Sequence, residues 1–189
     1  MENSLNWQEE SCKIVYNCRI FSITERSCRS PSLSPKQELK TFTVLDTADW
    51  AIVIPVLETQ KGREFIMVRQ WRHGAQDLSL EFPGGVFDKG EDSVQAAIRE
   101  LKEETGYTAG KMIKLGDFNP NPAIMSNHVH FFLAQDLVKT GPQDLDDDEY
   151  VTVETVPWKN AVNGMGKPPF IHALMATALM LYLREVPDN

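Results

Sequence analysis

The sequence predicts an α/β fold with a small antiparallel sheet at its N-terminus. Two apolar runs of strand length, 50–57 and 64–70, predict central strands, and 92–105 has the periodicity of one amphipathic helix. Two further strand-like segments, 13–25 and 38–45, come first and would form a hairpin too small to bury much surface alone. At 189 residues, the chain is long enough for one domain with a substantial core.

The N-terminal segments define an extension. Residues 13–25 (KIVYNCRIFSITE) carry β-branched and aromatic side chains in loose alternation, which is typical of a strand. Residues 27–36 are rich in Ser and Pro and predict a turn region, after which 38–45 returns as the second strand. We expect this hairpin to lie on the main domain or on a second copy of the chain. The chain therefore divides into an extension, 1–45, and a main domain, 46–189.

Later elements of the main domain alternate between strands and helices. A Gln-Lys-Gly turn separates the central strands, and an Asn-Pro-Asn-Pro stretch is held out of the helical region. A final helix is apolar almost all round, so we expect it to be buried in the core or in a subunit contact. In chain order, the elements expected after 92–105 are strands at 111–118 and 130–134, a short helix at 157–163 and the final helix at 170–184.

The helix at 92–105 has clear end signals. Asp92 or Ser93 can cap its N-terminus, with Gln95 placed for a capping box behind Asp92, and Gly106 can adopt the left-handed conformation that ends a helix. At 3.6 residues per turn, one stripe is apolar and is expected to face the core. That stripe consists of Val94, Ala97, Ile98 and Leu101.

Three carboxylates, Glu100, Glu103 and Glu104, fall on nearly the opposite arc of this helix. Like charges one turn apart repel by about 0.2–0.5 kcal/mol per pair, and Arg99 relieves only part of this. A divalent cation would relieve more, and oxygen ligands suit Mg²⁺ or Mn²⁺, whereas Zn²⁺ prefers His or Cys. A solvated acidic helix face is the alternative, and the three residues alone do not decide between the two.

The spacing around the helix is more specific. Gly85, five residues, Glu91, seven residues and then RELKEETGY at 99–107 resemble the Nudix hydrolase box, with every defining Gly, Glu and Arg in register. The one departure is Tyr107, which stands at a packing position where the family usually has an aliphatic residue. The resemblance implies an α/β/α sandwich around a mixed sheet. It also implies hydrolysis of a nucleoside diphosphate linked to another moiety.

The resemblance also assigns roles by position. Glu91 and Arg99 would be an ion pair that braces the loop against the helix. Two glycines in a row, Gly84 and Gly85, also allow the main chain to approach a ligand closely. Glu100 and Glu104 would be the main metal ligands, with Glu103 assisting and Gly84 adding its backbone carbonyl.

Three residues outside the box resemble substrate-binding positions of ADP-ribose and nucleoside-diphosphate-sugar hydrolases. Arg72, in VRQWRHG, is similar to the Arg that contacts the substrate pyrophosphate. An exposed loop cation is the alternative, and the nearby box favours the substrate contact. Glu81 resembles the Glu of the family's E-x-P-G-G lead-in. Pro122, which lies 15 residues after Tyr107, resembles the proline that marks ADP-ribose pyrophosphatases.

Five of the six residues at 144–149 are acidic. They do not form an EF-hand, because position six of such a loop would be Glu149 instead of Gly, and position twelve would be Thr155. The segment resembles the loop before a late strand in ADP-ribose-type Nudix enzymes, whose acid is a metal ligand or general base. By register Glu149 is the best match and Asp148 the next, while Glu103 remains the candidate on the helix. A solvated acidic turn is the alternative.

These resemblances predict a Mg²⁺-dependent hydrolase, with Mn²⁺ as a possible substitute. It would split ADP-ribose or another nucleoside diphosphate sugar into a nucleoside monophosphate and a sugar phosphate. One alternative is a pyrophosphohydrolase of nucleoside triphosphates or RNA 5′ ends, and another is a ligand-sensing Nudix domain without turnover. The net charge of −8 argues against nucleic acid, and the complete set of box carboxylates argues against the sensing domain.

Cysteine usage and hydropathy predict the cellular setting. Cys12, Cys18 and Cys28 form neither a CxxC pair nor a Cys/His set, so a reduced, cytoplasmic location is expected. The N-terminus has no apolar segment of the signal-peptide kind, and the apolar run at 170–183 is too short to span a bilayer. In ADP-ribose pyrophosphatases an N-terminal sheet of this size commonly helps to form a homodimer, which the resemblance therefore implies.

Overall fold

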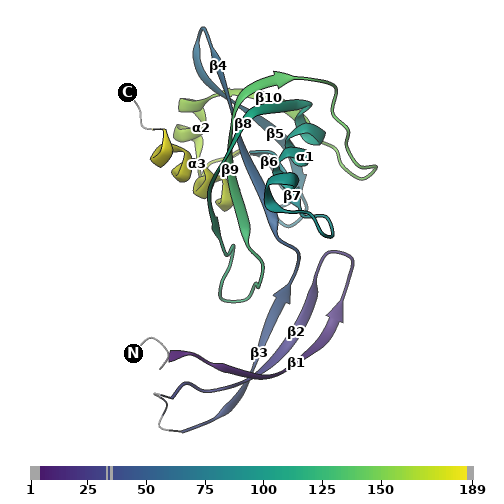
Figure 1. The fold of residues 1–189 in the computed structure, drawn as a ribbon, viewed down its shortest axis with the longest axis vertical. Coiled ribbons are helices and arrows are strands. Elements are labelled where there is room, and N and C mark those ends of the chain that lie inside the picture. Colours follow the sequence, from purple (N-terminus) through teal and green to yellow (C-terminus); the bar gives the residue numbers. More distant parts are fainter. Residues whose placement is uncertain (1–4, 33, 35, 187–189) are drawn as a thin grey trace. The chain divides into compact units, whose positions relative to one another are not determined.

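The computed structural model describes residues 5–32, 34 and 36–186, and the chain divides into two compact units (Figure 1). The first unit comprises residues 1–48 and 119–128, and the second comprises 49–118 and 129–189. Leu33 and Pro35, which belong to the predicted turn region, lie outside the described residues, as do both ends of the chain. The division after residue 45 into a dimerising extension and a catalytic domain stays a prediction.

An antiparallel sheet in the order β1-β2-β3 forms the first unit, as the sequence predicts. Its strands are β1 (Gln8–Asn17), β2 (Ser22–Arg29) and β3 (Leu39–Asp46). The expectation of a single strand over 13–25 is wrong, because the chain turns between Asn17 and Ser22. The amide of Cys18 donates to the carbonyl of Phe21 at 3.0 Å within this turn. Neither Gly nor Pro marks it, and β-branched and aromatic residues on both sides hide it in the sequence.

Residues 119–128 belong to the first unit because they bind to β3. The amide of Leu45 donates to the carbonyl of Ile124 at 2.7 Å, and the carbonyl of Leu45 accepts from the amide of Ser126 at 3.2 Å. The hydroxyl of Ser126 also donates to the carboxylate of Asp46 at 2.5 Å. A loop between two strands of the second unit is therefore part of the N-terminal fold.

A mixed sheet of seven strands forms the centre of the second unit. Its main path is β10-β5-β4-β9-β8, with β6 paired to β5 and β7 paired to β4. Strands β4 and β9 are parallel, and the other pairings are antiparallel. The strands are β4 (Trp50–Thr59), β5 (Gly62–Arg72), β6 (Asp77–Glu81), β7 (Gly84–Val86), β8 (Tyr107–Phe118), β9 (Val129–Lys139) and β10 (Thr152–Pro157).

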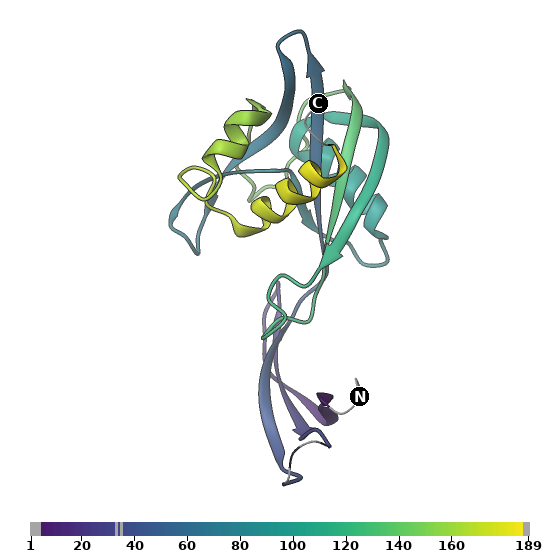
Figure 2. The ribbon, with the colours of Figure 1, turned by 90° about the vertical axis from the view of Figure 1, so that its left-hand side faces the viewer.

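Helices cover both faces of this sheet (Figure 2). α1 (Ser93–Thr105) lies on one face, and α2 (Trp158–Gly164) and α3 (Ala173–Glu185) lie on the other. Alternation along β4 supplies both cores: Ala51 and Val53 pack with α1, whereas Ile52 and Ile54 pack with α3. The predicted α/β/α sandwich around a mixed sheet is confirmed.

The ends of α1 follow their local signals. Asp92 is the N-cap, and its carboxylate accepts the backbone N–H groups of Val94 and Gln95, each at 2.9 Å. The side chain of Gln95 accepts in return from the amide of Asp92, which completes the capping box. Gly106 ends the helix with φ 71°, in the left-handed region. Both predicted end signals are confirmed.

The buried face of α1 differs from the expected apolar stripe. Val94 and Ile98 are 43% and 49% exposed, so their assignment to the core is wrong. The buried residues are Ala96, Ala97, Glu100, Leu101, Glu104 and Thr105. Two alanines allow the helix to lie close to β4, and the inner face includes two of the carboxylates. Within the described part of the chain, no helix is long and apolar enough to cross a membrane.

Candidate active site

The three carboxylates on α1 share one side of the helix but differ in burial. Glu100 and Glu104, one turn apart, are 8% and 4% exposed, whereas Glu103 is only half-buried. A solvated acidic face would leave such groups in water, and buried carboxylates are rare unless paired or bound to a cation. Burial therefore disfavours the plain surface interpretation that the sequence left open.

Strand β7 lies directly against these carboxylates. The amide of Gly84 donates to Oε2 of Glu104 at 2.8 Å. A Cβ on Gly85 would lie 2.4 Å from Oε1 of Glu100, so only glycine leaves room for that carboxylate where it stands. A Cβ on Gly84 would lie 2.1 Å from the carbonyl oxygen of Ala51 in β4. The glycine pair thus lets the main chain pack between β4 and α1. The Gly84 carbonyl as a metal ligand stays a prediction.

Arg99 contacts an acidic cluster that consists of Glu91 and the carboxylates of α1. Its Nε and Nη2 donate to the two carboxylate oxygens of Glu91, each at 2.9 Å, and hold the pKa of Glu91 below its ordinary value. Its Nη1 donates to Glu100 at 2.8 Å and to Glu103 at 3.0 Å. Its Nη2 also donates to the carbonyl of Val86 at 3.0 Å. One guanidinium therefore joins β7 and the following loop to the helix.

The cluster carries more negative charge than Arg99 offsets. Burial raises the pKa of Glu100 to about 7, against the attraction of Arg99. Burial likewise raises the pKa of Glu104 to about 8. The carboxylate of Glu149 contributes to both increases. A bound divalent cation would favour the charged forms of both groups, so this donor set fits a hard cation.

The loop before β10 carries the remaining predicted acids. The amide of Glu149 donates to the carbonyl of Asp146 at 3.0 Å, and its side chain is exposed, as is that of Asp148. The amide of Asp144 donates to the carbonyl of Glu103 at 2.9 Å, so this loop lies against α1. Over the residues that the structure describes, no three His, Cys, Asp or Glu side chains form a preassembled metal-binding group. The catalytic roles of Glu149 and Asp148 stay predictions.

A protein-family model matches most of the second unit. The model of the NUDIX domain matches residues 48–174, which include α1, β7 and the acidic loop. The chain belongs to the Nudix family. The identification as a Nudix hydrolase from the spacing of the box is confirmed.

Related Nudix proteins carry names that specify their substrates. The ADP-ribose pyrophosphatase of Bacillus subtilis is 39% identical over 134 residues, covering 70% of this chain and 72% of that protein. The ADP compounds hydrolase NudE of Escherichia coli is 30% identical over 132 residues, covering 69% and 67%. The GDP-mannose pyrophosphatase of Klebsiella pneumoniae is 32% identical over 128 residues, covering 63% of each. A crystal structure of an ADP compounds hydrolase matches with a TM-score of 0.80 at 22% identity, covers 95% of both chains and supports the Nudix fold.

A second charged pair of the Nudix domain lies on β5 and β6. Arg72 donates from Nε and Nη2 to the two oxygens of Glu81, at 2.8 and 2.6 Å. The residue Glu81 is 1% exposed, and although burial favours its neutral form, Arg72 holds its pKa below the ordinary value. Arg72 is close enough to Glu104 to act on its charge. The pair uses two of the five donors of the guanidinium, so Arg72 is fixed in plane with donors to spare.

Two further residues concern the binding of substrate. Pro122 is exposed and lies within residues 119–128 of the first unit, so its contact with substrate stays a prediction. His172, just before α3, is brought near Arg72 and Glu81 but was not predicted as a site residue. In the sequence His172 only interrupts an apolar run. No local pattern connects it with a strand so distant along the chain.

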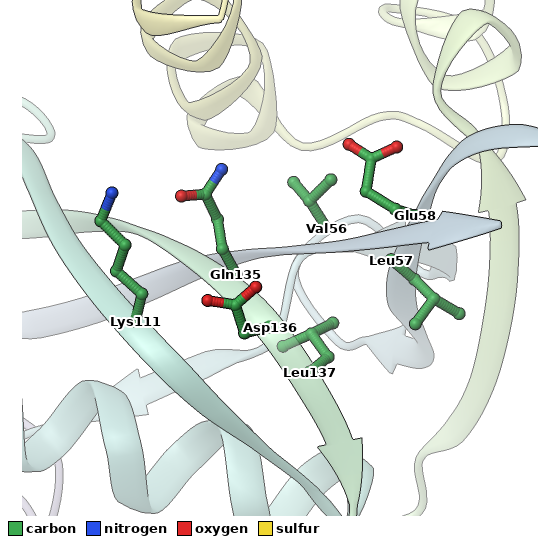
Figure 3. Close-up of a pocket in the computed structure, with 7 residues that line it drawn as sticks. All are labelled: Val56, Leu57, Glu58, Lys111, Gln135, Asp136 and Leu137. Atoms are coloured by element: carbon green, nitrogen blue, oxygen red, sulfur yellow. The ribbon is translucent and has the colours of Figure 1, made fainter.

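A cavity of about 330 Å³ in the second unit shares no residue with these groups (Figure 3). Strands β4, β8 and β9 line it with Val56, Leu57, Glu58, Lys111, Gln135, Asp136 and Leu137. Asp136 has φ 56°, in the left-handed region, and a Cβ on Gly110 would lie 3.0 Å from its Cβ. The cavity is separate from the Nudix carboxylates and takes no part in the function proposed below.

Proposed function

We propose that this Nudix protein hydrolyses the diphosphate of ADP-ribose or another nucleoside diphosphate sugar, giving a nucleoside monophosphate and a sugar phosphate. Relatives whose names specify ADP-ribose, ADP compounds and GDP-mannose support this substrate class. The observation that carries the proposal is the buried pair Glu100 and Glu104, packed against the main chain of β7 and near Arg72.

The metal in this proposal is Mg²⁺, with Mn²⁺ as a substitute. Glu100 and Glu104 would hold it, assisted by Glu103 and the carbonyl of Gly84. Mg²⁺ takes few carboxylates and completes its coordination with water and substrate phosphates, which suits a small set of oxygen donors. The burial that raises the pKa values of Glu100 and Glu104 supports this assignment, because a cation would offset the cost of charging them. When bound, the metal neutralises diphosphate charge and promotes ionisation of the attacking water.

Residues around the metal site would bind and orient the substrate. Arg72 keeps two donors on Glu81, and its remaining N–H groups would bind non-bridging phosphate oxygens. Glu81 then acts through Arg72 by fixing the plane of the guanidinium. The pair of Glu91 and Arg99 would brace the loop between β7 and α1, so that the glycines stay against the carboxylates.

The general base in this proposal is Glu149, which would accept a proton from the attacking water. Its carboxylate is exposed, stands on a loop and acts electrostatically on both Glu100 and Glu104. A base on a loop can approach the phosphorus after the substrate has bound. Asp148 is the second candidate, and Glu103 is the candidate on the helix.

The extension, residues 1–45, would build a homodimer, and residues 46–189 would carry the reaction. All ten residues of β1 are exposed, and Ile14 and Tyr16 are 61% and 55% exposed. A second copy of the chain would cover such apolar side chains. The cytoplasmic setting is also part of the proposal, in keeping with three free cysteines. Light scattering should give about twice the chain mass of 21.4 kDa. A single-chain mass at micromolar concentration would refute the dimer.

A substrate panel tests the reaction. ADP-ribose, GDP-mannose, ATP and a capped RNA are incubated with Mg²⁺, and phosphate is measured after a coupled phosphatase has acted on the products. A blank without the Nudix protein is subtracted for each substrate, because the phosphatase releases phosphate from ATP by itself. We expect turnover of ADP-ribose or GDP-mannose to exceed that of ATP and RNA. Comparable or faster turnover of ATP or RNA would overturn the substrate class.

The metal site is tested by Glu104→Gln, which keeps the size and helix propensity of the side chain. We expect kcat to fall at least about 10²-fold while the fold is retained, because a charged ligand is lost. Glu185→Gln, at an exposed helical position, is the matched control and should keep wild-type turnover. Near-wild-type turnover of Glu104→Gln at saturating Mg²⁺ would refute the assignment of Glu104 as a metal ligand.

A further inference from the structure

The segment that leads into α3 lies along β6, the strand that carries Glu81. Contacts are made on both sides of Glu81: the amide of Leu80 donates to the carbonyl of Pro169 at 2.9 Å, and the amide of Phe82 donates to Sδ of Met175 at 3.0 Å. Glu81 stands between the two donors, and His172 stands between the two acceptors. These contacts place the imidazole of His172 within electrostatic range of the ion pair of Arg72 and Glu81.

The hydrogen bonding of His172 determines its tautomer. Its Nδ1 accepts the backbone N–H of Leu174 at 3.1 Å, so the ring is the N-cap of α3. A backbone amide can only donate, and Nδ1 therefore carries no proton. The neutral ring must hold its proton on Nε2, which makes Nε2 a donor. Across the described residues, no hydrogen bond engages Nε2.

The ring is also kept neutral beside a charged pair. Burial lowers the pKa of His172, and the cation of Arg72 adds to this decrease against the attraction of Glu81. Protonation would place a hydrogen on Nδ1, where it would face the N–H of Leu174. It would also put a cation at the positive end of α3. At neutral pH His172 is therefore an uncharged hydrogen-bond donor.

We propose that His172 is a substrate-binding residue whose Nε2–H donates to an oxygen of the diphosphate that Arg72 binds. The inference rests on the proposed function and adds a residue to that site. Within the part of the chain that the structure describes, Nε2 makes no hydrogen bond to Glu81, whose two oxygens accept from Arg72. An anion held by the remaining donors of Arg72 would offer Nε2 an acceptor. One donor alone leaves a phosphate group free to rotate. Two donors from separate elements, one charged and one neutral, fix its orientation.

The variant His172→Asn separates binding from helix capping. Asparagine is a favoured N-cap and can accept from the amide of Leu174, but its shorter side chain does not reach the position of Nε2. We expect the KM for ADP-ribose to rise about three- to tenfold, as for one lost hydrogen bond, with kcat within about threefold. The melting temperature should stay within about 3 °C of the wild type.

His73→Asn is the matched control, since His73 is an exposed histidine next to Arg72 and should behave as wild type. An unchanged KM in His172→Asn would overturn the inference. A fall in melting temperature and kcat at constant KM would also overturn it, because His172 would then serve only as a helix cap.

A measurement without turnover separates this inference from the proposed reaction. Two-dimensional ¹⁵N–¹H spectra of the imidazole should show the Nε2–H tautomer of His172. ADP added in the presence of EDTA should shift the Nε2 signal. An Nδ1–H tautomer would refute the inference. So would an Nε2 signal whose chemical shift stays constant while ADP is added until the shift of the Nε–H signal of Arg72 stops changing. Hydrolysis of ADP-ribose by the wild type together with an unresponsive Nε2 would refute the role of His172 alone. A responsive Nε2 without any hydrolysis would refute the reaction and keep His172 as a diphosphate donor.

Discussion

Replacing Gly85 with alanine should disable the active site without unfolding the protein. A Cβ at this position would lie 2.4 Å from Oε1 and 2.7 Å from Cδ of Glu100. Non-bonded heavy atoms are most stable at about 3.5–4.0 Å, so the carboxylate must move by roughly 1 Å. The atoms in the way belong to the end of a flexible side chain, and moving them costs the fold little.

The expected effect is therefore on rate. A displacement of about 1 Å in a catalytic group can cost about 10²-fold in activity, and we expect a fall of that size in kcat for Gly85→Ala. Alanine also restricts the unfolded chain, which stabilises a protein by up to about 1 kcal/mol where the backbone permits it. The melting temperature should thus change by no more than about 4 °C. The phosphate that a coupled phosphatase releases from the two products of ADP-ribose hydrolysis measures kcat, and calorimetry measures the melting temperature.

Gly74→Ala is the matched control, because a Cβ on Gly74 would have no heavy atom within 4 Å. We expect it to keep wild-type activity and stability. Wild-type kcat of Gly85→Ala at saturating Mg²⁺ would refute the reasoning. A large fall in melting temperature would also refute the reasoning, because it would mean that the backbone of β7 moves instead of the carboxylate of Glu100.

Other predictions concern the brace, the base and the first unit. Arg99→Ala removes the hydrogen bonds to Glu91 and to two box carboxylates, so kcat should fall and unfolding free energy should drop by about 1–3 kcal/mol. Lost activity at an unchanged melting temperature would mean that Arg99 binds substrate instead. Glu149→Gln should depress kcat strongly and leave KM within a few-fold, whereas an active Glu149→Gln beside an inactive Asp148→Asn would identify the neighbour as the base. Although burial opposes it, hydrogen bonds and a nearby arginine hold the pKa of Asp46 below its ordinary value of 3.8. The unfolded chain thus takes up this proton at a higher pH than the folded chain, so the stabilisation is present above about pH 4 and is lost as pH falls through the folded pKa. The melting temperature of Asp46→Asn should lie below that of the wild type at pH 7, and the gap should close below about pH 4; a gap that widens on acidification would contradict this.

Local signals predicted the elements that local physics determines. The caps of α1 depend on Asp92, Gln95 and Gly106, all within a residue or two of the helix ends, and each acts as expected. The central strands are apolar runs long enough to be buried on both faces, and β4 and β5 form where those runs lie. The turn between β1 and β2 was missed, because Cys18–Phe21 contains none of the residues that usually mark a turn.

In the candidate site as well, contiguous patterns were predictable from the sequence, whereas contacts between residues far apart in the chain were not. The resemblance to the Nudix box, which is a contiguous pattern, predicted Glu100 and Glu104 as the main metal ligands, and that role stays a prediction. The pattern did not show that both are buried, because burial depends on β7, whose glycines leave room for the two side chains. Val94 and Ile98 were expected in the core on hydrophobicity, yet the position of the helix against β4 leaves them exposed. His172 lies within electrostatic range of Glu81 only because the segment before α3 is bonded to Leu80 and Met175 of α3 is bonded to Phe82, contacts between residues far apart in the sequence.

The attachment of residues 119–128 to β3 has a practical consequence for dissecting the protein. A shortened chain that begins at residue 49 would retain Ile124 and Ser126 but lose the main-chain groups of Leu45 that pair with them. Unpaired main-chain groups beside an apolar residue that is 50% exposed, Ile124, favour self-association. Because Phe118 and Val129 are paired neighbours in β8 and β9, a two-residue turn could join those strands in place of the excised loop. We therefore expect the second unit to stay monomeric on its own only when residues 119–128 are replaced by such a turn and the N-terminal residues are deleted as well.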